Sequence, residues 1–257
     1  MSVVTADDIG SSFRAAGVGA GDTLCLHSDA IVLAQMAIGT PQERADSFIN
    51  ALEDLLGPEG TLVVPTFTYS FTEGKPYDPS MSPSKVGVLT EMFRVRQNVL
   101  RTRDPIFSFA VSGSKAREYA SASVEESFGD KSAFALLQRD NAWIACLGCA
   151  LDRVTFVHRV EQIAGVDYRY PKVFSGEVIE NGRQTELKTT YLVRDLERAT
   201  QTDLRLLQSK LIAEGKLNLK PVGRIALLTV RAQDFLASAL ELLKTNPSGL
   251  IKEGAAS

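Results

Sequence analysis

Apolar positions along the chain follow a helical period in some segments and form short continuous runs in others. In residues 41–56 they recur every three to four positions, behind Thr40 as an N-cap, and the segment ends at Gly57-Pro58. This spacing predicts a helix with one buried face. Similar spacing predicts helices over residues 7–16, 86–96, 133–137, 154–163, 196–214 and 232–243.

Short apolar runs rich in β-branched residues alternate with these helices. They predict buried strands over residues 23–27, 60–68, 107–112, 142–147 and 225–230. Residues 177–193 instead predict a β-hairpin, because Asn181-Gly182 is the signature of a type I′ turn. The alternation indicates an α/β fold with layered helices and an antiparallel hairpin added late in the chain.

The chain shows no internal repeat and no linker composition, so we expect one domain over residues 1–257. Near residue 175 the alternation of strands and helices gives way to the predicted hairpin, so a boundary between two subdomains would fall there. Residues 72–84 contain three prolines, a glycine and few apolar residues. They predict a loop of about a dozen residues, long enough to suggest a function.

Composition and charge narrow the classes of function. The chain is 44% hydrophobic and 23% charged, as in an ordinary globular protein, and its formal net charge of −3 argues against a nucleic-acid binder. The first residues lack the basic start and apolar core of a signal peptide, and no run of about 18 apolar residues predicts a membrane span. Cysteine occurs only as Cys25, Cys146 and Cys149, an odd and sparse set that favours a reducing cytoplasm.

Several common catalytic motifs are absent. The sequence has no phosphate-binding Gly-x-x-x-x-Gly-Lys-Ser/Thr loop, no dinucleotide-binding Gly-x-Gly-x-x-Gly after a strand, and no Gly-x-Ser-x-Gly elbow. Cys146 and Cys149 match Cys-x-x-Cys but lie in an apolar run. A redox site would favour a helix N-terminus and zinc needs four ligands, so we interpret both as small core residues and expect no metal.

His158 and Glu161 form a His-x-x-Glu pair on a predicted helix. A spacing of three residues places both side chains on one face, where a carboxylate can orient an imidazole and favour its charged form. Such a pair suits a general base, because the unperturbed pKa of histidine, about 6.5, lies near working pH. The alternative is a surface pair without a role, which is common on helices.

Two other places carry candidate chemistry. His27 ends an apolar strand just before Ser28 and Asp29, where α/β folds gather ligand contacts. The alternative is a half-buried histidine satisfied by the backbone. In residues 101–105, Arg-Thr-Arg-Asp-Pro, two guanidinium groups and a hydroxyl would suit phosphate oxygens, whereas the alternative is a solvated loop.

Together these segments resemble the aminoglycoside 3-N-acetyltransferase family, also called the antibiotic N-acetyltransferase family. The resemblance extends in order over residues 26–161, which is more specific than any one motif, and is loose in the last third. Its parts are Leu-His-Ser at 26–28, ALEDLLGPEGTLVVPTFT at 51–68, GVLTEMFRVRQNVLRTRDPIFS at 87–108, Phe-Gly-Asp-Lys-Ser at 128–132, and Thr-Phe-Val-His with the following Glu at 155–161.

The resemblance implies an α/β/α layered fold, unlike the GNAT acetyltransferases, and transfer of acetyl from acetyl-CoA to an amine. It implies that His158 is the catalytic base and that Glu161 is its partner or anchors the substrate amine. The residues implied for the coenzyme side are His27, Ser28, Asp29, Thr66, Arg101, Thr102 and Ser108. Asp29 departs from the family by replacing a Ser, and Asp104 by replacing a His.

Charge in the last third bears on the acceptor. Aminoglycosides are polycations, so a site for them should be acidic, yet residues 191–220 contain 4 acidic and 6 basic residues. This balance favours an anionic acceptor, and our hypothesis is an amino sugar linked to a nucleotide. The alternative acceptor is an aminoglycoside antibiotic, and the alternative interpretation of the charge is an incidental solvated surface.

Alternatives from other classes use the same residues. A thioester hydrolase would pass the acyl group to water through His158, and a silent protein would bind coenzyme A or carbohydrate without turnover. The expected partners are therefore a small amine and a CoA thioester, without nucleic acid or membrane. A homodimer is a further expectation.

Overall fold

The structure, a computed structural model, describes residues 3–36, 39–198 and 200–252. A seven-stranded sheet forms its centre, in the order β3-β4-β2-β1-β5-β9-β8. β1, β2 and β5 are parallel neighbours, while β4 and β9 pair antiparallel on either side of them. The strands are β1 Thr23–Ser28, β2 Thr61–Pro65, β3 Leu100–Arg101, β4 Phe109–Gly113, β5 Trp143–Leu147, β8 Asn218–Val222 and β9 Ile225–Arg231.

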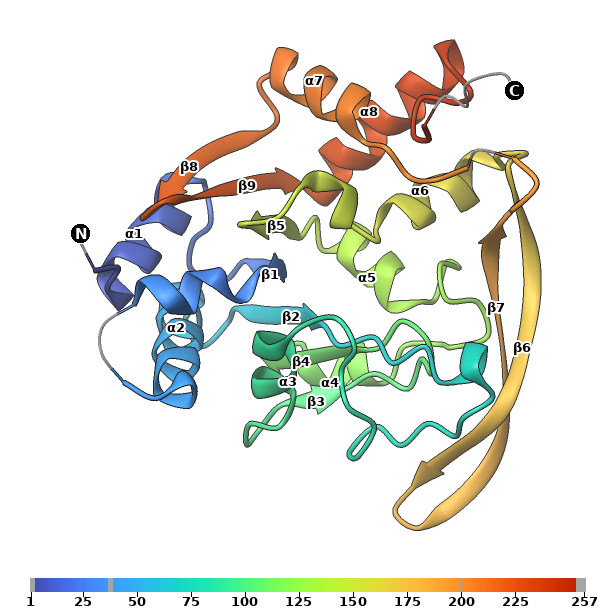
Figure 1. Ribbon diagram of the computed structural model, residues 1–257, viewed down its shortest axis with the longest axis horizontal. Coiled ribbons are helices and arrows are strands. Elements are labelled where there is room, and N and C mark those ends of the chain that lie inside the picture. Colours follow the sequence, from blue (N-terminus) through green and yellow to red (C-terminus); the bar gives the residue numbers. More distant parts are fainter. Residues whose placement is uncertain (1–2, 37–38, 199, 253–257) are drawn as a thin grey trace.

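Helices cover both faces of this sheet (Figure 1), so the α/β/α layering is confirmed. One face carries α1 Ala6–Ala15, the 3-10 helix η1 Ala30–Gln35, α2 Pro41–Leu56 and α3 Val88–Arg94. The other carries α4 Ala116–Ala120, α5 Ala133–Arg139, α6 Val157–Ala164, α7 Arg205–Ala213 and α8 Ala232–Thr245. No helix within the described ranges is long and apolar enough to cross a membrane.

Alternating residues of each central strand supply two separate cores. On β5, Trp143 and Ala145 face the α1–α2 side, whereas Ile144 and Cys146 face the α5–α8 side. A strand that buries both faces must be apolar throughout, which is why these segments are continuous apolar runs rather than alternating patterns.

The predicted caps of α2 are confirmed. The Thr40 hydroxyl accepts a hydrogen bond from the backbone N–H of Glu43, and the Glu43 carboxylate accepts from the Thr40 N–H. This reciprocal pair satisfies two backbone donors at the helix start. The helix ends at Gly57, whose φ of 65° is a left-handed conformation that glycine adopts without steric cost.

The late antiparallel hairpin is also confirmed and is longer than predicted. Strands β6 Arg169–Glu180 and β7 Arg183–Arg194 form a separate two-stranded sheet along one side of the molecule (Figure 1). Asn181 and Gly182 both have positive φ, as a type I′ turn requires. Residue 175, where a sub-boundary would fall, lies inside β6, and the single-domain organisation stays a prediction.

One prediction in the C-terminal third was wrong, and one strand was missed. The helix predicted over residues 196–214 begins only at Arg205, just after the backbone N–H of Leu204 donates to Asp152; Leu196, inside the predicted span, is 81% exposed. The edge strand β8 was not predicted, because Pro221 and alternating polar residues weaken its pattern.

Candidate active site

Loops that follow three parallel strands meet at one edge of the central sheet. β1, β2 and β5 end at Ser28, Pro65 and Leu147, and β1 lies between the other two strands. Such an edge, where connections leave neighbouring strands in opposite directions, is where open α/β sheets bind ligands. A cavity of about 560 Å³ opens there, which we call the strand-end cavity. It is lined by Leu26, His27, Ser28, Asp29, Pro65, Phe67, Tyr69, Lys85, Val86, Thr90, Cys149, Asp152, Arg153 and Thr155.

A second cavity of about 750 Å³ adjoins the first and contains His158. We call it the histidine cavity. The two share Tyr69, Asp152 and Arg153, so a molecule in one can meet a molecule in the other. Its remaining lining residues come chiefly from α6, β7 and the segment before α7: Phe107, Ala150, His158, Arg169, Tyr191, Leu192, Val193, Arg194, Gln201, Thr202 and Lys252.

The predicted pair of His158 and Glu161 is present on α6. The imidazole Nδ1 lies 2.6 Å from the Glu161 carboxylate, which is fully buried, while the His158 side chain retains 20% exposure. An ionised carboxylate only accepts hydrogen bonds, so Nδ1 carries the proton and Nε2 of the neutral ring is an acceptor. The ring is therefore prepared to receive a proton from a group bound in the histidine cavity.

Arg169, the first residue of β6, completes a triad with this pair. Its Nε lies 2.5 Å from Oε2 of Glu161, and its side chain is 4% exposed. Burial alone raises the pKa of Glu161, but the charges of His158 and Arg169 and the hydrogen bond from His158 outweigh burial and bring the pKa below its ordinary value. Glu161 is therefore ionised at neutral pH, although it is buried.

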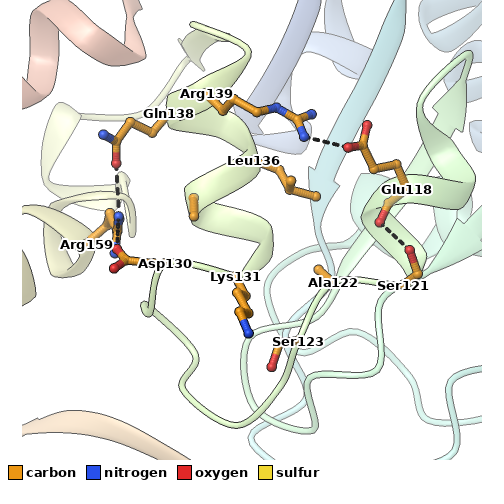
Figure 2. A pocket seen from close by; sticks show the side chains of 11 residues that line it. Glu118, Ser121, Ala122, Ser123, Asp130, Lys131, Leu136, Gln138, Arg139 and Arg159 are labelled. Carbon is orange, nitrogen blue, oxygen red and sulfur yellow. Dashed lines mark hydrogen bonds and ion pairs between the residues drawn. The ribbon is translucent and has the colours of Figure 1, made fainter.

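Arg159 anchors α6 on a different side from His158. Its guanidinium donates to Gln138 Oε1 at 3.1 Å and to the Phe128 carbonyl at 2.8 Å, and it pairs with Asp130 at 2.6 Å. Figure 2 shows Arg159 between Gln138 and Asp130, in a surface hollow that none of the predicted site residues lines. These contacts fix the position of the helix that carries His158.

His27, Ser28 and Asp29 line the strand-end cavity. Burial lowers the pKa of His27 to about 4, so its ring is neutral at working pH. Its Nδ1 and the Ser28 hydroxyl are buried and have no hydrogen-bond partner in the part of the chain that is described. Asp29 is exposed and accepts a hydrogen bond from the backbone N–H of Ile31 at 2.9 Å, which caps η1.

Four further residues predicted for the coenzyme side lie elsewhere, in a buried polar network. Arg101 Nε donates to the hydroxyls of Thr66 and Ser108 at 3.2 Å, and its Nη groups donate to backbone carbonyls of Thr66 and of the loop at 79–82. The Thr102 hydroxyl accepts from the backbone N–H of Phe109 at 2.9 Å. None of the four lines either cavity.

Asp104, the second departure from the family pattern, has a local structural role. It is 7% exposed, and one carboxylate oxygen accepts hydrogen bonds from the backbone N–H groups of Ile106 and Phe107 at 2.8 Å. This turn is one that aspartate forms readily. Burial raises the pKa of Asp104 despite these bonds.

The two cysteines of the Cys-x-x-Cys motif differ in environment. Cys146 is buried in β5, as interpreted from the sequence, but Cys149 is half-buried and lines the strand-end cavity. A hydrogen bond from Cys146 lowers the pKa of Cys149. Across residues 3–36, 39–198 and 200–252, no group of three or more His, Cys, Asp or Glu side chains is arranged to hold a metal ion.

Sequence reasoning missed Arg169, Arg153, Arg194 and Lys252, all of which line the histidine cavity. They come from β6, the 3-10 helix η3 Leu151–Arg153, the end of β7 and the segment after α8. Only the folded chain brings them together, and no local motif marks them. The only sequence signal for this positive charge was the excess of basic residues in 191–220. That segment contains Arg194 but not the other three residues.

Known proteins resemble this chain over most of its length. Residues 31–244 match the sequence model of the family described as Aminoglycoside 3-N-acetyltransferase. The chain is 30% identical to aminoglycoside N(3)-acetyltransferase IV of Salmonella sp over 236 residues, 90% of this chain and 84% of that protein. It is 24% identical to aminoglycoside N(3)-acetyltransferase III of Pseudomonas aeruginosa, with 91% of each covered.

Solved structures share the fold. The apoenzyme of aminoglycoside acetyltransferase AAC(3)-IVa superposes with a TM-score of 0.81 at 24% identity, covering 99% of this chain and 94% of that one. The binary complex of AAC-IIIb with CoASH gives a TM-score of 0.80 at 20% identity, covering 98% and 100%. AAC-VIa bound to sisomicin gives 0.81 at 19% identity, covering 95% and 98%.

Proposed function

Because the chain belongs to the aminoglycoside 3-N-acetyltransferase family, we propose that it transfers acetyl from acetyl-CoA to an amino group of an amino sugar, with His158 as general base. The chain is an N-acetyltransferase, as its relatives are named. The observation that carries the proposal is the hydrogen bond of 2.6 Å between His158 Nδ1 and the buried, ionised Glu161. His158 lines a cavity that is large enough for a sugar.

The triad fits the proton transfer that amide formation needs. An amine attacks the thioester carbonyl carbon with its lone pair, and the nitrogen becomes positively charged as the C–N bond forms. We propose that Nε2 of His158 takes the excess proton and that the C–S bond then breaks, with the proton passing to the departing CoA sulfur. Glu161 stabilises the imidazolium that exists between these steps, as a carboxylate beside a catalytic histidine does.

The strand-end cavity is the side we assign to the CoA thioester. The Ser28 hydroxyl and the His27 Nδ1 are buried and have no hydrogen-bond partner in the described part of the chain. The cavity therefore has polar groups available to a ligand. We propose that Ser28 donates to the thioester oxygen, which becomes negative during attack. Because the two cavities adjoin at Tyr69, Asp152 and Arg153, both substrates can be held together for direct transfer.

Thr66, Arg101, Thr102 and Ser108 have a different proposed role. Arg101 donates to the hydroxyls of Thr66 and Ser108 and to the backbone at 66, 79 and 82, while the Thr102 hydroxyl accepts from the backbone N–H of Phe109. We propose that they position the loop after β2, whose Phe67, Tyr69 and Lys85 line the strand-end cavity. They would then support coenzyme binding without contacting the coenzyme.

The acceptor that we propose is an amino sugar linked to a nucleotide, rather than the aminoglycosides for which the relatives are named. The supporting observation is the sign of the charge around His158: the histidine cavity contains Arg153, Arg194 and Lys252 against the single carboxylate of Asp152. A polycationic drug would be repelled by such a wall, whereas a phosphate-bearing sugar would be attracted.

The test is release of free thiol from acetyl-CoA by the purified protein. The acceptor panel contains aminoglycosides, nucleotide-linked amino sugars and no amine, and each assay is repeated with His158→Ala. Amine-dependent release that falls about 10²–10⁴-fold in the variant supports the proposal. Release without amine would instead indicate a thioester hydrolase, and CoA binding without release from any acceptor would contradict acetyl transfer from this donor.

A further inference from the structure

We propose that Arg153, Arg194 and Lys252 form an anion-binding site that holds the phosphate groups of a phosphorylated amino sugar while its amine reaches His158. The inference rests on the proposed function, because His158 defines where the acceptor lies. It goes further by assigning acceptor recognition to three residues that no motif marks.

These three cations differ from other basic residues around them in lacking a carboxylate partner. Within residues 3–36, 39–198 and 200–252, no carboxylate oxygen lies within 4.0 Å of their side-chain nitrogens. Neighbouring arginines on the same segments are paired: Arg169 with Glu161, Arg198 with Asp167, and Arg205 with Asp203. Guanidinium and ammonium groups left unpaired along a cavity wall are available to an anionic ligand.

The one carboxylate in the cavity is already engaged. Asp152 Oδ1 accepts a hydrogen bond of 2.6 Å from the backbone N–H of Leu204, at the start of α7. Arg169 does not add to the free positive charge, because Glu161 beneath the cavity neutralises it. The cavity therefore has an excess of two positive charges when His158 is neutral, close to the charge of about −2 on a phosphate monoester or a diphosphate.

The three cations also come from separate segments that converge on one space. Arg153 ends η3 and lines both cavities, Arg194 ends β7, and Lys252 follows α8. A volume of about 750 Å³ accommodates more than one sugar ring, so the anionic group can lie beside the ring that carries the amine.

Aromatic side chains also line the histidine cavity. The ring centroids of Phe107 and Tyr191 lie 5.0 Å apart edge to face, and those of Phe107 and Tyr69 lie 6.1 Å apart. All three rings offer an apolar surface that suits the carbon face of a sugar, and Tyr69 and Tyr191 also carry a polar hydroxyl. The arrangement combines an apolar platform for the ring with two guanidinium forks, whose geometry matches phosphate oxygens.

The experiment measures steady-state acetylation and equilibrium binding on the full chain. Single variants Arg153→Gln, Arg194→Gln and Lys252→Gln are compared with wild type and with Arg198→Gln. The last is a matched control, because Arg198 is close in sequence to Arg194, is exposed, is paired with Asp167 and lies outside the cavity. Acceptors are free amino sugars, their 1-phosphates, their uridine diphosphate conjugates and gentamicin, and uridine diphosphate alone is titrated by calorimetry.

We expect each cavity variant to raise the KM of a phosphorylated acceptor about tenfold or more, with kcat within about threefold of wild type. The KM of the free amino sugar should stay constant, as should every parameter of Arg198→Gln. Uridine diphosphate should bind wild type and bind each cavity variant more weakly. Use of sugar phosphates without binding of uridine diphosphate would support the site and identify the sugar phosphate as its ligand.

Failure of this inference is distinct from failure of the proposed function. Faster acetylation of gentamicin than of any phosphorylated sugar, unchanged in the three variants, would overturn the anion site and leave the acetyltransferase intact. Binding of uridine diphosphate that the variants abolish, without acetylation of any acceptor, would support the anion site and count against acetyl transfer.

Discussion

Arg169 and His158 contact the same carboxylate oxygen of Glu161, at 2.5 Å and 2.6 Å. The buried carboxylate is therefore shared between a fixed cation from the β6–β7 hairpin and the imidazole on α6. The charge of Arg169 helps to lower the pKa of Glu161 against the effect of burial. The hairpin thus contributes to the ionisation of Glu161 as well as to the wall of the cavity.

Replacing Arg169 should shift the pH dependence of the rate. The charge of Arg169 and its hydrogen bond help to lower the pKa of Glu161, so Arg169→Met should raise that pKa. The buried carboxylate should then lose its charge at a higher pH, and the acid limb of kcat should move in the same direction, with Arg169→Lys close to wild type. The measurement is kcat against pH from 5 to 9. An acid limb at the same pH in Arg169→Met and wild type would show that the guanidinium does not influence Glu161 in catalysis.

Removing either member of the predicted pair should lower kcat by different routes. His158→Gln deletes the proposed base and should lower kcat about 10²–10⁴-fold. Glu161→Gln retains the proposed base but loses the charge that would stabilise the imidazolium, so kcat should fall as well while the KM for acetyl-CoA stays within about threefold. Gln162→Ala, on the same helix and bonded to Glu126, is the control. A Glu161→Gln variant with wild-type kcat would assign Glu161 a purely structural role.

The sequence sufficed for this pair because a spacing of three residues on a helix is a local property. It did not suffice for Arg169, which lies beyond Gly165 on a strand and returns to Glu161 only through the folded path of the chain. Likewise, α7 begins at Arg205 because Asp152, about fifty residues earlier, accepts from the Leu204 N–H. Local polarity over 196–204 gave no sign of this tertiary contact.

Resemblance to a family identified positions but not their contacts. Thr66, Arg101, Thr102 and Ser108 fall on family motifs, yet their hydrogen bonds are made within the protein. A motif position can be occupied by a residue that contacts a ligand or by one that supports a loop. Only the structure distinguishes these cases, since burial and bonding are not visible in the sequence pattern.

Arg101→Met should weaken the loop after β2 rather than a phosphate contact. Loss of its bonds to Thr66, Ser108 and the carbonyls at 79 and 82 should lower the free energy of unfolding by about 2–4 kcal/mol. The KM for acetyl-CoA and for its 3′-dephospho form should rise by the same factor. Arg103→Met, which removes only an exposed pair with Glu180, is the control. A selective loss for acetyl-CoA would instead place Arg101 on the 3′-phosphate.

His27 should make the protein sensitive to mild acid. The unfolded chain binds a proton at this residue near pH 6.5, whereas the folded chain does so only near pH 4, so stability is complete above pH 6.5 and declines as pH falls toward 4. The decline from this group amounts to about 3 kcal/mol. Urea unfolding of wild type and His27→Gln at pH 7 and pH 5 measures it. Equal losses in both proteins between the two pH values would rule out His27 as the cause.

Cys149 offers a chemical test of which cavity takes the donor. Cys25 and Cys146 are buried. Burial raises the pKa of Cys25, and the hydrogen bond to Cys149, together with burial, raises the pKa of Cys146. The same bond lowers the pKa of Cys149, whose side chain lines the strand-end cavity. N-ethylmaleimide should therefore label one thiol per native chain, and Cys149→Ser should abolish labelling. Saturating coenzyme A should slow the labelling about tenfold or more, because the ligand and the reagent compete for one space. Labelling that coenzyme A leaves unchanged would move the thioester out of the strand-end cavity.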